Sequence, residues 1–181
     1  MSLAIVQSRA QVGIHAPAVS VEVNLAGGLP KMSIVGLPET VVKESKDRVR
    51  AALQNSGFEV PARRITVSLA PADLPKDGGR FDLAIALGIL AASRQINAET
   101  LAQYEFLGEL SLSGELRATG GILPAALAAA KSEHALIVPA ADAAEAALVA
   151  GHESYAADHL LKVCAHLHQH EQLPRCEDSD T

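Results

Sequence analysis

Polar and apolar residues alternate in the first third of the chain, as they do in strands that have one buried and one wet face. The alternation is clear over residues 19–25 and again over residues 64–70. Residues 31–36 form a further strand after the turn residues 27–30, and we expect a hairpin or near-hairpin with residues 19–25. Residues 2–12 add a neighbouring strand.

The helices are predicted where apolar residues recur about every 3.6 residues instead of every second residue. Pro38 and Glu39 begin the first one, because proline suits the first turn and an acid complements the helix dipole, and Gly57 ends it. Residues 81–93 are apolar nearly all round, which predicts a helix buried on more than one side. Further along, the pattern predicts a hairpin over 105–112 and 115–118, a buried strand over 135–139, and helices over 122–132, 141–149 and 158–168.

This order of elements predicts an α/β domain in which helices cover a mixed sheet in two layers. The 181 residues are enough for one domain with a sizeable core. We expect that domain to span residues 1–170. Residues 171–181 have almost no apolar content and are expected to form a polar tail or linker.

The formal charge of −6 is unevenly distributed. Residues 1–132 carry 13 basic and 12 acidic side chains, whereas residues 133–181 carry 2 and 9. The overall charge therefore does not decide for or against a nucleic-acid partner. No signal peptide and no apolar stretch long enough for a membrane span is visible, and Cys164 and Cys176 form no CxxC pair. These features predict a cytoplasmic protein with reduced cysteines and no membrane partner.

The glycine-containing loop at residues 75–82 lies between a strand and the buried helix. Such a junction can hold an anion through backbone amides and the helix dipole. The alternative is a tight turn needed for packing, which we favour because Asp77 and Asp82 would repel an anion at close range. No Walker A sequence, GxSxG elbow or HExxH pair occurs.

The three alternating histidines near the C-terminus would share one face of a strand. On the predicted helix, only His166 and His170 remain neighbours while His168 points elsewhere. We therefore expect no metal site there, and we expect Cys164 on the same helix to be a core residue rather than a nucleophile.

Basic residues recur on one flank of the first helix, and two more follow it. They are Lys43, Lys46 and Arg50, with Arg63 and Arg64 beyond. A ridge of this kind can contact phosphates. The alternative is a solvated helix face balanced by Glu39, Glu44 and Asp47, and the residues alone favour it.

Several longer stretches resemble a known family. Residues 34–40, 42–52, 69–76, 106–117 and 120–124 are similar to the N-terminal region of the ComM/YifB competence proteins, which are magnesium-chelatase-related AAA+ ATPases. The resemblance covers roughly residues 1–170. It implies a Lon-protease-like domain, of the ribosomal-protein/GHMP-type superfold, placed ahead of an AAA+ motor.

The resemblance also implies what the parent protein does. It would be a hexameric DNA helicase that drives branch migration in natural transformation and recombination, with ATP and Mg used by the motor. On this view the 181 residues are part of a longer protein, bind no cofactor themselves, support ring assembly or DNA binding, and meet DNA through the full-length ring.

Lon proteases use a Ser-Lys dyad, and the resemblance locates both positions here. Arg80 stands where the nucleophilic serine would be, and Ala125 stands at the lysine position after Gly120-Gly121. A guanidinium is not a nucleophile and an alanine is not a base, so we expect no enzymatic activity from this chain.

Two other functions remain open from the sequence. A serine hydrolase would need an activated serine, but Ser68 and Ser93 have no visible base partner. A GHMP-type nucleotide-binding enzyme would use a glycine-rich loop before a helix, but the loop at residues 75–82 lacks the serine-rich continuation and carries two acids.

Overall fold

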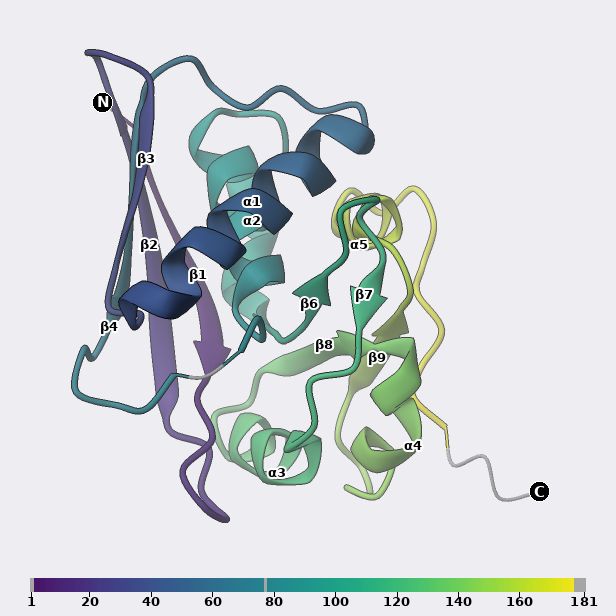
Figure 1. The fold of residues 1–181 in the computed structure, drawn as a ribbon. Helices are drawn as coiled ribbons and strands as arrows, with labels where there is room; N and C mark the ends of the chain where they lie inside the picture. The colour runs from purple at the N-terminus through teal and green to yellow at the C-terminus, as the bar shows by residue number, and fades with distance from the viewer. Residues whose placement is uncertain (1, 77, 178–181) are drawn as a thin grey trace.

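The computed structural model describes residues 2–76 and 78–177 (Figure 1). Its strands are β1 (Ser2–Arg9), β2 (Ala18–Ala26), β3 (Lys31–Val35), β4 (Arg64–Ala70), β5 (Tyr104–Phe106), β6 (Glu109–Leu110), β7 (Leu116–Arg117), β8 (Ala135–Pro139) and β9 (Ser154–Ala157). Its α-helices are α1 (Glu39–Asn55), α2 (Asp82–Ala92), α3 (Ile122–Lys131), α4 (Ala143–Ala146) and α5 (Leu160–Leu167), with short 3-10 helices η1 (Ala98–Gln103) and η2 (Ala140–Asp142).

The main sheet has the strand order β3-β4-β2-β1-β5-β8-β9, and β6 pairs separately with β7. It is mixed: β2 is antiparallel to β1 and β4, while the remaining pairs are parallel. The predicted α/β class with a mixed sheet is therefore confirmed.

The first four strands of the sheet form a two-layer half, as the alternation predicts. Val19, Val21, Val23 and Leu25 of β2 are fully buried, and α1 and α2 cover this face. The opposite face stays open to solvent, with Leu3 and Ile5 among its exposed apolar residues. Helix α2 is buried on all sides, as its uniformly apolar sequence predicts.

The predicted hairpin between the second and third strands is wrong. β4 lies between β2 and β3, pairing antiparallel with β2 and parallel with β3. The reason is that α1 connects β3 to β4 as a crossover, the ordinary connection for a parallel pair. The turn at residues 27–30 instead carries the chain past β4 to the edge of the sheet.

The two-layer prediction is also wrong for the other half of the sheet. Helices lie on both faces of β5-β8-β9 (Figure 1). Leu136 and Val138 of β8 belong to a cluster with α3 and α4, while Ile137 belongs to the main core with Tyr155 and α5. Parallel strands covered on both faces lack alternation, which is why β8 looks uniformly apolar and why short β9 was not predicted.

Part of the segment expected to form a polar tail or linker packs against the domain. Leu173 is buried, the Ala156 amide donates to the Pro174 carbonyl at 3.0 Å, and the Cys176 amide donates to the Ser154 carbonyl at 2.9 Å. This segment thus satisfies backbone groups of the edge strand β9. Only residues 178–181 of the expected tail lie outside the described part of the chain.

The predicted hairpin over residues 105–118 is split in two. β5 joins the main sheet, whereas β6 and β7 turn back on each other through residues 111–115. The helix expected over residues 141–149 is shorter, since η2 precedes α4 and α4 ends at Ala146. In the described ranges, no helix combines the length and apolar character needed to cross a membrane.

Candidate functional site

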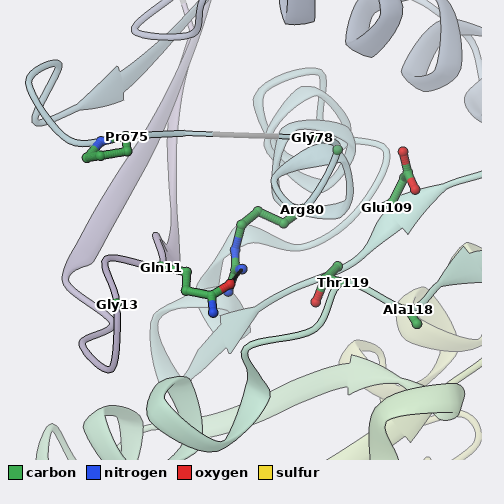
Figure 2. Close-up of a pocket in the computed structure, with 9 residues that line it drawn as sticks. Gln11, Gly13, Pro75, Gly78, Arg80, Glu109, Ala118 and Thr119 are labelled. Atoms are coloured by element: carbon green, nitrogen blue, oxygen red, sulfur yellow. Dashed lines mark hydrogen bonds between the residues drawn. The ribbon is translucent and has the colours of Figure 1, made fainter.

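A cavity of about 400 Å³ opens beside the loop that precedes α2 (Figure 2). Three separate segments form it: the turn after β1, the loop between β4 and α2, and the β6–β7 region with the residues that follow. Its lining residues are Gln11, Gly13, Pro75, Gly78, Gly79, Arg80, Glu109, Ala118 and Thr119. The sequence prediction identified only the middle segment, because no local pattern shows that the other two meet it.

Arg80 is the cation on the described cavity wall, and only 7% of it is exposed. Its Nε donates to the Arg9 carbonyl at 3.0 Å, and its Nη1 donates to Oε1 of Gln11 at 3.4 Å. Nη2 is shielded from water and has no acceptor among the described residues. Burial lowers the pKa of Arg80, and the negative charge of Asp142 acts in the opposite direction.

The loop that carries Arg80 is held by a buried lysine that sequence reasoning did not single out. Lys76 is 1% exposed, and its Nζ donates to the Pro71 carbonyl at 2.5 Å and the Leu74 carbonyl at 3.2 Å. Burial lowers the pKa of this amine. Gly78 follows with φ +60°, a conformation that L side chains rarely adopt, and a Cβ there would meet open space.

Asp82 does not oppose an anion in the cavity, contrary to the sequence argument. Its carboxylate is fully buried and accepts from Arg48 Nε at 2.7 Å, Ser45 Oγ at 2.8 Å and the Leu110 amide at 3.1 Å. Burial raises the pKa of Asp82, and the Arg48 contact counteracts it. Asp77, the other acid in that argument, lies outside the described residues.

Arg48 was also missed, although its spacing contains a signal. It lies three residues after buried Ser45 and four before buried Ala52, which places it on the inner face of α1. Glu109 lies 3.7 Å from Arg48 Nε, so the acid on the described cavity wall has a cation beside it. Figure 2 shows the Glu109 carboxylate pointing away from the Arg80 guanidinium.

The two positions of the lost dyad lie in different surroundings. Arg80 borders the cavity, whereas Ala125 is fully buried in α3 within the second hydrophobic cluster and does not line the cavity. Gln11 connects the two loops. Its amide oxygen accepts from Arg80 Nη1. Its amide also packs against Gly121, where an added Cβ would lie only 2.5 Å from the Gln11 amide. The described cavity wall thus carries neither a serine nor a lysine.

A second buried arginine lies next to this cavity, and each of its three guanidinium nitrogens has an acceptor. Arg9 forms a two-point ion pair with Glu105, at 2.5 Å from Nε and 2.9 Å from Nη2. Its Nη1 donates to the Ala16 carbonyl at 2.9 Å, and His134 Nδ1 lies 2.8 Å from the same carboxylate. No short motif joins residues so far apart in sequence, so the sequence did not reveal this network.

The serines offer no activated nucleophile in the described ranges. Ser93 Oγ donates to the Ile89 carbonyl at 2.8 Å, an ordinary helix contact. Within residues 2–76 and 78–177, no serine hydroxyl forms a hydrogen bond with a histidine or a lysine. Nothing in the described geometry therefore favours the serine-hydrolase alternative.

The C-terminal histidines form structural contacts. His166 Nε2 lies 3.0 Å from the Tyr104 hydroxyl, and its Nδ1 accepts from the Leu173 amide at 3.0 Å. The rings of His168 and His170 lie 5.6 Å apart, so the expectation that only His166 and His170 are neighbours is wrong. The reason is that α5 ends at Leu167 and Gln169 adopts φ +60°.

Cys164 is buried, and burial raises the pKa of its thiol to about 12, which suits a core residue and not a nucleophile. Within the part of the chain that the structure describes, no group of three or more His, Cys, Asp or Glu side chains could hold a metal ion.

Four of the five predicted basic residues lie near the edge strand β3, and Arg50 is exposed further along α1. Lys43 and Lys46 line a shallow depression over β3, and Lys46 Nζ donates to the Met32 carbonyl at 3.3 Å. Arg64 pairs in register with Lys31, an additional cation, and the Arg63 carbonyl accepts from the Lys31 amide. We call this set the basic edge; it comprises Lys31, Lys43, Lys46, Arg50, Arg63 and Arg64.

No carboxylate of the described residues lies within 4.0 Å of a charged nitrogen of the basic edge. The balancing role expected for neighbouring acids is therefore only partly present: Glu44 pairs with Arg48 at 3.7 Å, outside the set.

The fold and the cavity together define an α/β domain with a polar, arginine-lined cavity and no serine or lysine on its described wall. The family described as subunit ChlI of Mg-chelatase matches residues 21–142. The chain therefore belongs to this family.

Within the family, the chain is similar over nearly its whole length to proteins named ComM and YifB. It is 56% identical over 174 residues to competence protein ComM of Haemophilus influenzae, covering 96% of this chain and 34% of ComM. It is 50% identical to the YifB proteins of Salmonella typhimurium and Escherichia coli, covering 97% and 99% of this chain and 35% and 36% of theirs. The chain thus spans about a third of the length of these relatives.

Proposed function

We propose that this chain is a non-catalytic, Lon-protease-like domain at the N-terminal end of a ComM-like AAA+ ATPase, and that it contributes a DNA-contacting surface. The similarity to ComM and to the ChlI family supports the parent class. The cavity chemistry supports the loss of peptidase activity, since an arginine stands at the nucleophile position and Ala125 is buried away from the cavity.

The observation that carries the DNA proposal is the basic edge. Six cations from α1, β3 and the start of β4 with the residue before it have no carboxylate of the described chain within 4.0 Å, so no ion pair there competes with phosphates for them. Each copy alone would neutralise few phosphates and bind weakly. A hexameric ring built by an ATP- and Mg-dependent motor would present six such edges, and their linkage would raise the effective concentration.

The test uses the full-length parent protein with Lys43, Lys46 and Arg50 all changed to Glu. We expect DNA affinity to fall at least about tenfold, and the magnitude of the salt slope to fall by roughly one for each phosphate that is no longer neutralised. A matched control reverses three exposed cations elsewhere, Arg94, Arg117 and Lys131, which also lack a close carboxylate in the described chain.

If the control lowers affinity as much as the test variant, the effect is one of total charge and the DNA proposal fails. If affinity and slope are unchanged in both, the basic edge is a solvated face and the domain's contribution is assembly of the ring. Cytoplasmic location and branch migration follow from the parent class and are part of the same proposal.

A further inference from the structure

We propose that the Arg80 cavity is a binding site for a carboxylate, which pairs with the Nη1–Nη2 edge of the Arg80 guanidinium. The proposal uses no residue of the basic edge and goes beyond the DNA-contacting function. It starts from a side chain that is more than nine-tenths buried, lines a cavity, and leaves one nitrogen without an acceptor in the described chain.

The guanidinium has one edge left for a ligand. Nε is taken by the Arg9 carbonyl at 3.0 Å, and Nη1 has only a long contact of 3.4 Å to Gln11 Oε1. Two parallel N–H donors on one edge match the two oxygens of a carboxylate, and charge-assisted pairs of this kind are stronger than neutral ones.

Gln11 stands where the ligand would be. Its planar amide has the shape of a carboxylate, and its oxygen accepts from Nη1, one of the two nitrogens that the ligand would use. Gln11 lies at the exposed turn after β1, so its side chain can swing into solvent when a stronger acceptor arrives. Figure 2 shows the two side chains meeting across the cavity.

The surroundings favour a singly charged ligand over a phosphate dianion. Glu109 lines the same cavity, and Asp142 is close enough to act on Arg80 while accepting from the Thr119 amide at 3.0 Å. Each added negative charge on the ligand increases repulsion from these acids. The volume of about 400 Å³ suits a small acid or the end of a peptide.

The test is an NMR titration of the 181-residue chain with acetate at constant ionic strength. We expect saturable shifts at the amides of Gly78, Gly79 and Thr119, with an affinity in the millimolar range. Arg80→Met should abolish them, whereas Arg94→Met, a change at an exposed arginine outside the cavity, should leave them unchanged.

Two substitutions at Gln11 test the competition directly. Gln11→Ala removes the internal competitor and should bind acetate several-fold more tightly. Gln11→Glu supplies an internal carboxylate and should bind no acetate. Circular dichroism and urea unfolding establish that each variant is folded before it is compared.

Trialanine with a free C-terminal carboxylate and with a C-terminal amide distinguishes the source of the ligand. If free trialanine binds about tenfold more tightly than acetate and the amidated peptide does not bind, the site takes the C-terminus of a chain. If free trialanine and acetate bind equally well, the site takes a small acid. The proposal is overturned if wild-type and Gln11→Ala proteins both show no saturable shift, if shifts survive in Arg80→Met, or if inorganic phosphate binds more tightly than acetate.

Discussion

Arg9 and Arg80 are buried arginines in direct contact, yet their surroundings differ in kind. Arg80 Nε donates to the carbonyl of Arg9. Arg9 has a carboxylate, two backbone carbonyls and a serine hydroxyl around it, so its charge is neutralised within the fold. Arg80 has no carboxylate of the described chain within 4.0 Å and one nitrogen without an acceptor there. The Arg9 charge is therefore neutralised within the fold, whereas Arg80 keeps a nitrogen without an acceptor, which is the basis for proposing an external ligand.

The largest expected effect comes from breaking the Arg9 pair. Glu105→Gln leaves the Arg9 charge buried without a counter-charge and should lower the free energy of unfolding by about 3–5 kcal/mol. Urea unfolding measures the loss, with Glu99→Gln at an exposed position as control. The double variant Arg9→Met with Glu105→Leu should recover most of the stability; if it does not, the pair has a role beyond mutual neutralisation.

The next largest effect is expected at buried His166, whose contacts should make the free energy of unfolding depend on pH. Burial lowers the pKa of His166 below its ordinary 6.5, with Glu153 acting in the opposite direction, so folding favours the neutral ring. Its stabilising contribution is present above pH 6.5 and is lost as pH falls through the lower folded pKa. Protonation of Nδ1 also breaks the bond from the Leu173 amide.

We therefore expect the stability of the wild-type chain to fall between pH 7 and pH 5 more steeply than that of His166→Gln, which keeps an acceptor but does not titrate. His170→Gln, at an exposed position, should follow the wild type. Thermal unfolding across this pH range measures the slopes. Identical slopes for wild type and His166→Gln would mean that the ring does not change its charge on unfolding in this range.

The smallest effect is expected at Arg80. Arg80→Met removes two hydrogen bonds but also removes a buried charge that has no carboxylate beside it, so the free energy of unfolding should change by no more than about 1 kcal/mol. Urea unfolding of Arg80→Met and Glu105→Gln under the same conditions compares the two losses of stability. A loss as large as that of Glu105→Gln would mean that Arg80 is a structural cation like Arg9.

Sequence patterns located most elements but not their long-range partners. The alternation over residues 19–25 and 64–70 predicted β2 and β4, but strand order depends on which strands compete for each edge, so the β2–β3 hairpin was wrong. The packing of residues 173–176 against β9 rests on backbone hydrogen bonds, which leave almost no trace in composition.

The candidate site was predictable to a similar extent. The loop at residues 75–82 and the position of Arg80 were identified from the sequence and the family resemblance. Gln11 and Thr119 were not, because they reach the cavity from segments about 70 residues before and 40 after the loop. The repulsion expected from Asp82 was overestimated, since its partner Arg48 belongs to another helix.

The most direct test of the comparison is the behaviour of the two guanidinium groups themselves. Nitrogen-15 NMR resolves the Nε–H groups of Arg9 and Arg80, with Arg80→Met identifying the second signal. Both Nε–H groups are held in buried hydrogen bonds, so the response to acetate distinguishes them. We predict that the Arg9 signal does not move when acetate is added, whereas the Arg80 signal shifts until it saturates. The absence of a saturable shift at the Arg80 signal, or an equal shift at both signals, would contradict the claim that the Arg80 guanidinium binds an external carboxylate.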